Sequence, residues 1–473
     1  MEKISVLQDE VLPPSEPHLK RALKNRHIQF ISIGGAIGTG LFMGSGKAIA
    51  LSGTSIILVY MIVGFFLFFI MRAMGELLLT DLRFRSFADV VAHYLGLRAG
   101  YMLSWSYWLS WSVAIIADVI VVAGFFQFWF PDVPIWATAS FTMLLLLALN
   151  MMAVKLFGEV EFWFAIIKIV AIVALIVTAF ILIGISYQSP EGVTASLNNL
   201  FEKGTMLPHG ISGFLAGFQI AIFSFAGTEL IGTTAAEAEN PKRNLPKAIN
   251  TIPFRILIFY VLALACIISV TSWSHVPADR SPFVELFLFA GFPAAAGIIN
   301  FVVLTSAASS ANSGVYASCR MLFGLARRNS APSFFAKLSR SGVPVMAIAF
   351  SGIAMFCGLC LLTIFPNVME LFTVVSTVAT ILNLYIWTMI MLGYLAYRKK
   401  APELHQSSIF KLPGGRITSV ACLGFLLAGF WVLSLQADTR LALYVMPFWF
   451  LFLFVSYRPR KAASDQVGSQ ITQ

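Results

Sequence analysis

Charged residues are scarce in this chain. Of its 473 residues only 11% are Asp, Glu, Lys or Arg, while 58% are hydrophobic and 43 are Phe. Soluble domains carry about a quarter charged residues, so this composition excludes a soluble globular protein. Apolar runs of about 20 residues recur without the alternation of barrel strands. The sequence therefore predicts an all-α polytopic membrane protein.

Cysteine and histidine are also sparse, with five Cys and six His. The six His are scattered over loops and chain ends without metal-ligand spacing. Cys357 and Cys360 form a C-x-x-C, but inside an apolar run, where buried small side chains are more common than a metal or redox site. We therefore expect no metal, no cofactor and no enzymatic activity.

The apolar runs predict twelve spans. No cleavable signal peptide is expected, because the first 27 residues are polar and lead straight into the first run. The loops are short, so the spans form one membrane domain. The predicted spans are residues 28–50, 54–76, 99–129, 134–153, 160–184, 209–232, 251–272, 293–318, 343–364, 368–396, 417–434 and 440–457.

The basic residues predict an orientation. With the N-terminus in the cytoplasm, 27 of the 32 Lys and Arg residues fall on the cytoplasmic side, four on the outer side, and Lys168 within a span. A bias of this size predicts that both termini are cytoplasmic. It also accounts for the net charge of +10, because such residues set topology and contact anionic lipids. Nucleic-acid binding is therefore not implied.

The first span carries six glycines between Gly34 and Gly46. Each glycine costs a helix interior about 1 kcal/mol relative to alanine, so we expect the helix to break near residues 34–40. Broken backbone inside a bilayer survives only where it is buried in protein or lines a cavity. The alternative is close helix packing through small residues spaced four apart, and this segment alone does not decide between the two.

The sixth span has a matching irregularity at residues 223–230, where a Gly-Thr pair precedes Glu229. The starts of the first and sixth spans lie five spans apart, and an odd number gives the two copies opposite orientations. Interrupted helices at corresponding positions of inverted halves indicate a transporter site. Half-helix N-termini attract a carboxylate, and unwound carbonyls attract an ammonium. The pair of segments therefore favours a site for an amino-acid zwitterion.

Four motifs stand out along the chain. They are Gly-Gly-Ala-Ile-Gly-Thr-Gly-Leu-Phe at 34–42, Met-Arg-Ala-Met-Gly-Glu-Leu at 71–77, Glu-Phe-Trp-Phe at 161–164 followed by Lys168, and Ala-Ala-Glu at 235–237 with Asn-Pro at 240–241. Together they resemble the amino-acid transporter family of the amino acid–polyamine–organocation superfamily. The resemblance spans roughly residues 20 to 460. It implies a five-plus-five inverted-repeat core of the leucine-transporter type with two additional spans. The implied division is a cytoplasmic tail 1–26, a core 27–396 with repeats of about 27–184 and 209–396, two spans within 397–458, and a cytoplasmic tail 459–473, both tails expected to be disordered.

The function that the resemblance implies is proton-coupled import of small neutral amino acids, such as D-serine, D-alanine and glycine, across a bacterial inner membrane. The alternative is a permease or exchanger of the same superfamily for proline, aromatic or cationic amino acids. A membrane enzyme would need clustered ligands, which the sequence lacks. Two broken helices that meet at the midplane favour alternating access over a channel or a sensor.

By resemblance, the backbone N–H groups of Gly38, Thr39 and Gly40 bind the substrate carboxylate, with the Thr39 hydroxyl as a helper. The Ala36 carbonyl is expected to bind the ammonium.

The sixth span completes this predicted site. Carbonyls near Phe223 and Ala226 are expected to bind the ammonium, and Gly227 lets the span unwind. Phe223 matches an aromatic gate, although with so many Phe it can also be an ordinary packing residue.

Lys168 is the charge that most needs a reason, because an ionisable residue within a span is costly and marks an ion or proton pathway. A buried lysine can exchange a proton near neutral pH. By resemblance, Lys168 takes the place of a sodium ion in sodium-coupled relatives, near carbonyls of 32–35 and the hydroxyls of Ser309 and Ser310. This predicts a proton symporter; a structural cation is the alternative.

Four more charged residues lie in or beside spans. Glu229 is either a second titrating group or a helix-cap acceptor. Asp118 is a packing residue or a proton relay. Glu76 and Arg72, at a cytoplasmic span end, are expected to form an ion-paired gate or an anchor. The third span also carries Trp105, Trp108 and Trp111, which are expected in core packing or a pocket lining.

Overall fold

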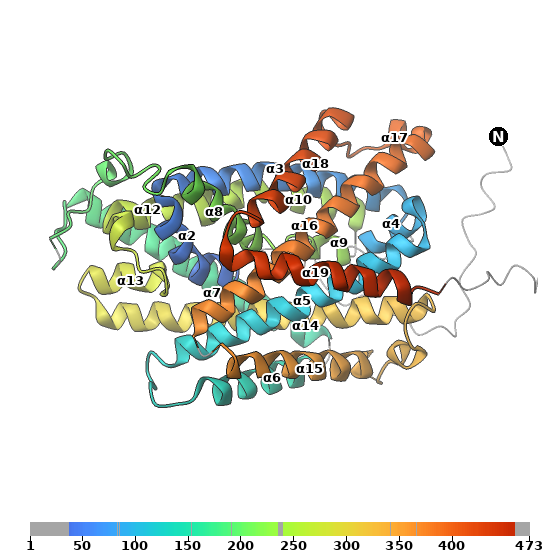
Figure 1. Cartoon of the computed structure of the whole chain (residues 1–473), viewed down its shortest axis with the longest axis horizontal. Helices are drawn as coiled ribbons and strands as arrows, with labels where there is room; N and C mark the ends of the chain where they lie inside the picture. Colours follow the sequence, from blue (N-terminus) through green and yellow to red (C-terminus); the bar gives the residue numbers. More distant parts are fainter. Residues whose placement is uncertain are drawn as a thin grey trace, which may run out of the picture.

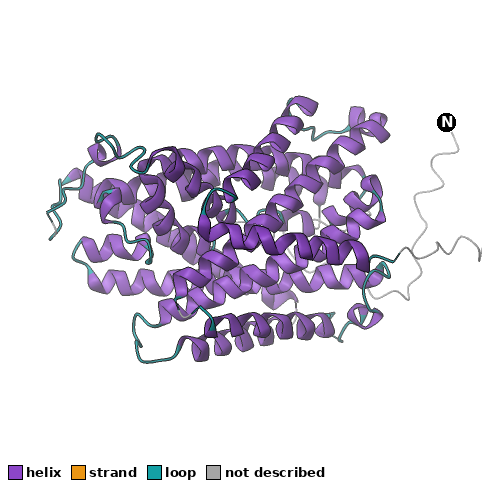
Figure 2. Ribbon diagram, viewed as in Figure 1, coloured by secondary structure: helices purple, strands orange, loops and turns teal. Residues whose placement is uncertain are grey.

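The computed structural model describes residues 37–458, except for 83, 85, 153, 191, 235–239, 341 and 366. These residues form an all-helical structure, with an isolated antiparallel bridge between Gln188 and Thr194 (Figure 2). Both predicted tails, and the predicted break residues 34–36, lie outside the described residues.

Eight α-helices lie among the described residues up to Thr234. They are α2 (Ser45–Ser52), α3 (Ile56–Thr80), α4 (Phe87–Leu95), α5 (Leu97–Phe126), α6 (Ile135–Asn150), α7 (Val154–Gly184), α8 (Gly210–Ser224) and α9 (Leu230–Thr234). The remaining helices are α10 (Pro241–Asn250), α11 (Ile252–Arg255), α12 (Ala263–Thr271), α13 (Pro282–Phe289), α14 (Pro293–Arg327), α15 (Val345–Leu359), α16 (Val368–Lys400), α17 (Pro402–Ser407), α18 (Gly415–Leu433) and α19 (Ala437–Ser456).

Nine helical stretches among the described residues are long and apolar enough to cross a membrane, and α6 and α8 are shorter apolar helices. The first stretch, Gly40–Thr80, has 41 residues. At 1.5 Å per residue it measures about 60 Å, twice the hydrocarbon thickness of a bilayer. A 3₁₀ turn at Gly53–Ser55, where Gly53 has φ +58°, divides it into α2 and α3. The chain is a multi-pass membrane protein.

Some helix boundaries differ from those predicted. Helix α14 continues to Arg327, nine residues past the predicted end at 318, because its last turns leave the apolar region but remain helical. Helix α4 begins with a capping box in which Ser86 and Asp89 bond each other's backbone. A search for runs long enough to cross a membrane does not reveal such short helices.

The centre of the molecule is built on α5 and α14, which lie side by side, with α16 packed against α5 (Figure 1). Helices α6 and α15 pair along one edge (Figure 1). The tryptophans of α5 contribute to this core: the Trp108 indole donates to Ser351 Oγ at 2.9 Å, and Trp111 packs where Gly314 leaves room.

The two cysteines of the C-x-x-C are not buried, and that prediction was wrong. Cys357 and Cys360 are exposed, whereas Cys266, Cys319 and Cys422 are buried. An apolar span offers small side chains a place on its outward face as well as in the core, and hydropathy does not distinguish the two.

Helices α2 and α8 pack antiparallel through small residues. A Cβ on Gly44 would lie 2.8 Å from Ile220 Cγ2, and one on Gly217 would lie 2.4 Å from Ser52 Oγ. Ser52 also donates to the Gly213 carbonyl at 2.8 Å. Residue numbers rise along α2 as they fall along α8, so the two helices run in opposite directions. The glycine-rich segment therefore packs closely, while the predicted break there stays a prediction because residues 34–36 lie outside the described part of the chain.

Candidate functional site

The sixth apolar segment is interrupted between α8 and α9. Five residues, 225–229, separate the two helices, and Gly227 has φ +95°, which glycine adopts without strain. The Gly227 N–H donates to both carboxylate oxygens of Glu229, with the nitrogen 3.1 Å from Oε1 and 3.2 Å from Oε2. Glu229 therefore stabilises the unwound segment, and a titrating role for it stays a prediction.

The first segment starts its described helix at Thr39. The Gly38 carbonyl accepts from the N–H groups of Leu41 and Phe42, both at 3.2 Å. The turn Gly40–Gly44 is π-helical, a form that often occurs at functional sites. The first N–H groups of a helix have no partner within it and carry its positive dipole end. These N–H groups belong to the residues predicted to bind a carboxylate.

The first segment meets the interrupted sixth segment at Gly40. A Cβ on Gly40 would lie 2.6 Å from Ser224 Cα, at the last residue of α8. A Cβ on Gly38 would lie 2.8 Å from Ser310 Oγ of α14. Only glycine permits backbones to approach so closely. The predicted Gly38, Gly40 and Ser310 are therefore brought together beside the interruption of the sixth segment.

Asp118 of α5 joins this junction. The Thr39 hydroxyl donates to Asp118 Oδ1 at 2.5 Å, and Asp118 is 2% exposed. Its second oxygen, Oδ2, has no hydrogen-bond partner among the residues that the structure describes. The Thr39 hydroxyl thus has Asp118 as its acceptor in this structure, and its help to a substrate carboxylate stays a prediction, as does the role of the Thr39 backbone N–H.

Lys168 lies 1% exposed in α7 and interacts electrostatically with Asp118 and Glu161. Glu161, also fully buried, accepts from Ser309 Oγ at 2.8 Å and from Asn312 Nδ2 at 2.7 Å. Ser309, which we expected beside Lys168, thus donates to the neighbouring carboxylate. Sequence reasoning missed Glu161 as a site residue, although its spacing of seven from Lys168 puts both on one helix face.

Phe223 directly precedes Ser224, the residue of α8 that meets Gly40. It is 6% exposed and packs edge-to-face on Phe372 of α16, with ring centroids 5.7 Å apart. Its carbonyl accepts from the Ala226 N–H at 3.0 Å, which leaves the oxygen one lone pair. Phe225 packs edge-to-face on Tyr60, whose hydroxyl lies 2.9 Å from Ser224 Oγ.

Glu76 and Arg72 anchor the connection between α16 and α18. Glu76 is fully buried and pairs with His405 Nδ1 at 2.6 Å, and its other oxygen accepts from the Leu412 N–H at 2.7 Å. Arg72 donates to the Lys411 carbonyl at 2.5 Å. These contacts fit the anchor interpretation.

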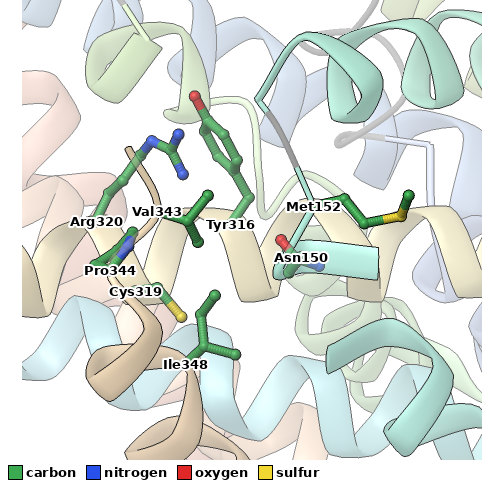
Figure 3. A pocket seen from close by; sticks show the side chains of 8 residues that line it. All are labelled: Asn150, Met152, Tyr316, Cys319, Arg320, Val343, Pro344 and Ile348. Carbon is green, nitrogen blue, oxygen red and sulfur yellow. The ribbon is translucent and has the colours of Figure 1, made fainter. Parts of the chain in front are cut away.

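A separate pocket lies where α6 ends and α15 begins (Figure 3). None of the residues predicted to bind substrate lines it. Its lining consists of Asn150, Met152, Tyr316, Cys319, Arg320, Val343, Pro344 and Ile348.

The amino acid permease family model matches residues 27–462. The chain belongs to the amino acid permease family. Since members of this family are permeases, the protein is a transporter and not an enzyme.

Relatives of this permease match it over almost their whole length. It is 53% identical over 453 residues, 96% of either chain, to the D-serine/D-alanine/glycine transporter of Escherichia coli (strain K12). It is 42% identical to the DL-alanine permease SerP2 of Lactococcus lactis subsp. cremoris, over 94% of this chain and 96% of the relative. It is 40% identical to the aromatic amino acid transport protein AroP of Escherichia coli O6:H1, over 93% and 95%.

Proposed function

We propose that this permease imports small neutral amino acids, with D-serine, D-alanine and glycine as substrates, by proton-coupled alternating access. The observation that carries the proposal is the 53% identity over 96% of the chain to a relative named for these three substrates. The similarity to a DL-alanine permease supports a small side chain and tolerance of both configurations at Cα.

The proposed architecture has twelve spans, because the first long stretch divides at Gly53 and α6 and α8 add two shorter spans. Residues 27–396 form the inverted-repeat core, and α18 and α19 are the two additional spans. The antiparallel packing of α2 on α8 supports the inversion. The bias of Lys and Arg supports cytoplasmic termini in a bacterial inner membrane, with basic residues near anionic lipids.

In the proposed binding mode, the substrate carboxylate accepts from the N–H groups of Gly38, Thr39 and Gly40 at the helix start. Carbonyls of the interrupted sixth segment, at Phe223 and Ala226, accept from the ammonium, as does Ala36, which lies outside the described residues. These groups recognise what all amino acids share. Selectivity therefore comes from side chains around the junction.

The proposed coupling ion is a proton carried by Lys168. Its burial beside Glu161 and Asp118 supports this role, because a charge inside a bilayer is costly unless it is paired or exchanges a proton. One carboxylate oxygen of Asp118 accepts a hydrogen bond from Thr39, and the other, Oδ2, has no hydrogen-bond partner among the described residues. This arrangement supports a proton relay through Asp118 between Lys168 and the substrate site. A lysine that only braces helices is the alternative.

A competition panel tests the substrate assignment. Uptake of labelled D-alanine is measured in cells that produce the permease, with each amino acid in excess. D-serine, D-alanine and glycine are expected to inhibit strongly, and tryptophan, proline and lysine weakly. Inhibition by an aromatic, proline or cationic amino acid in place of these three would establish the alternative permease or exchanger.

A further inference from the structure

A polar path leads from the buried Lys168 to the pocket of Figure 3. Glu161 accepts from Asn312 Nδ2, and Asn312 Oδ1 accepts from Asn150 Nδ2, each at 2.7 Å. Asn150 in turn lines the pocket, together with Arg320 (Figure 3). All members between the lysine and the pocket are buried, with Asn312 3% and Asn150 8% exposed.

The path follows one face of α14. Ser309, Asn312, Tyr316 and Arg320 recur at intervals of three or four residues, so they line one helix face. From Ser309 to Arg320 the helix rises about 16 Å, roughly half the hydrocarbon thickness. The path ends on the side that the basic residues assign to the cytoplasm.

The hydrogen-bond directions give each residue a role. Asn150 donates to the Asn312 oxygen, which fixes the Asn312 amide so that its N–H points at Glu161. Ser309 donates to the other Glu161 oxygen. Both donors favour the ionised carboxylate, the form that can accept a proton from an ammonium group. The two asparagines are therefore positioning residues for Glu161.

We propose that the proton leaves Lys168 for the cytoplasm through Glu161 and the Asn150 pocket, an inference that rests on the proposed proton coupling. The Lys168 ammonium transfers its proton to the Glu161 carboxylate, which leaves a neutral amine and a carboxylic acid. Glu161 then gives that proton to water that enters from the pocket beside Asn312 and Asn150, and the carboxylate is restored. The Asn150, Tyr316 and Arg320 side chains provide the polar partners that such water needs.

The charged and titratable groups around Glu161 suit this transfer. Lys168 and, beyond it, Asp118 face it from the substrate side. At the pocket, the Arg320 guanidinium lies over the Tyr316 ring, 3.2 Å from the centroid, and Cys319 is buried beside them. The positive charge of Arg320 makes it unfavourable for a proton to stay in the pocket, so the proton passes on to the cytoplasm.

The test separates net proton movement from substrate exchange. The purified permease in liposomes is assayed for accumulation driven by a pH gradient and for counterflow, in which labelled substrate exchanges without net proton release. The substrate is whichever amino acid the competition panel identifies, so a wrong substrate assignment and a wrong path are distinguishable. Asn312→Ala is compared with Asn300→Ala, since Asn300 is an equally buried asparagine of α14 that donates to Phe125 away from the path.

We expect Asn312→Ala to lower accumulation about tenfold, the scale of a lost hydrogen bond to a charged group, and to change counterflow less than about twofold. Met152→Trp blocks the pocket from an exposed position and is expected to lower accumulation, while Met151→Trp, next to it but outside the lining, leaves both activities unchanged. If Asn312→Ala and Asn300→Ala lose accumulation and counterflow to the same extent, the role of Asn312 is structural only. Full accumulation in Met152→Trp would overturn the pocket as the exit.

Discussion

At the residue scale, the account depends most on Lys168, a cation buried between two carboxylates. Lys168→Ala removes the group that we propose carries the proton. Uphill uptake driven by a pH gradient is expected to disappear, while counterflow continues. Assays on the same liposome preparation give both quantities, and persistent uphill uptake would show that the lysine is a structural cation.

Gly40 determines how closely the two interrupted segments approach. In Gly40→Ala the new Cβ meets the Ser224 backbone, which cannot rotate away. We therefore expect the free energy of unfolding to fall by about 1–3 kcal/mol and transport activity to be lost. Gly424→Ala is the matched control, because a Cβ at Gly424 on α18 meets nothing within 4 Å. Thermal unfolding of the purified proteins compares them. Equal unfolding temperatures for the two variants would contradict the close approach.

Sequence reasoning at this scale found glycines and charges but not their partners. Gly38, Gly40 and Lys168 were predicted because each is out of place in an apolar span. Glu161 was missed because its role depends on Ser309 and Asn312, which lie about 150 residues further along the chain. The partner of the Thr39 hydroxyl was not foreseen for the same reason, since its acceptor, Asp118, lies on α5.

At the scale of elements, the interruption between α8 and α9 is set by Gly227. Gly227→Ala forces a side chain into φ +95°, which costs about 1–2 kcal/mol, and shifts the segment that we propose binds the ammonium. Gly192 has φ +85° in the loop after α7 with nothing within 4 Å of an added Cβ, so Gly192→Ala carries a similar strain away from the site. Uptake measured at equal protein abundance is expected to fall only in Gly227→Ala. Matching uptake in the two variants would argue against a role for the interruption in binding.

The connection between α16 and α18 is held by the fully buried Glu76. Glu76→Gln keeps the shape but weakens the contacts with His405 and the Leu412 N–H, so we expect the unfolding free energy to fall by about 1–3 kcal/mol. Glu403→Gln, on the exposed α17, is the control and is expected to unfold like the original protein. Unfolding curves for the variants in one detergent check this, and coincident curves would refute the anchor.

The positions of the long helices follow from hydropathy, because each apolar run must fill the bilayer. Short elements such as α4 and α10 do not follow from it, since neither is long enough to span. They begin at local signals instead, a capping box in α4 and a proline at the first position of α10. Nor does hydropathy tell a lipid-facing from a core-facing side, which is why Cys357 and Cys360 were placed wrongly.

At the scale of the whole molecule, the account joins a substrate site to a proton site. The interrupted segments meet at Gly40 and Ser224, Thr39 contacts Asp118, and Asp118 interacts with Lys168 and through it with Glu161. The carboxylate and ammonium groups of a substrate bound at the junction change the electrostatic potential at Lys168. We propose that this shared environment couples the two movements.

The measurement that tests this claim most directly is the internal pH of liposomes that contain the purified permease and a pH-sensitive dye. Addition of D-alanine outside, with no pH gradient imposed, is expected to acidify the interior as substrate enters, and Lys168→Ala is expected to abolish the signal. Substrate entry without acidification would contradict the account.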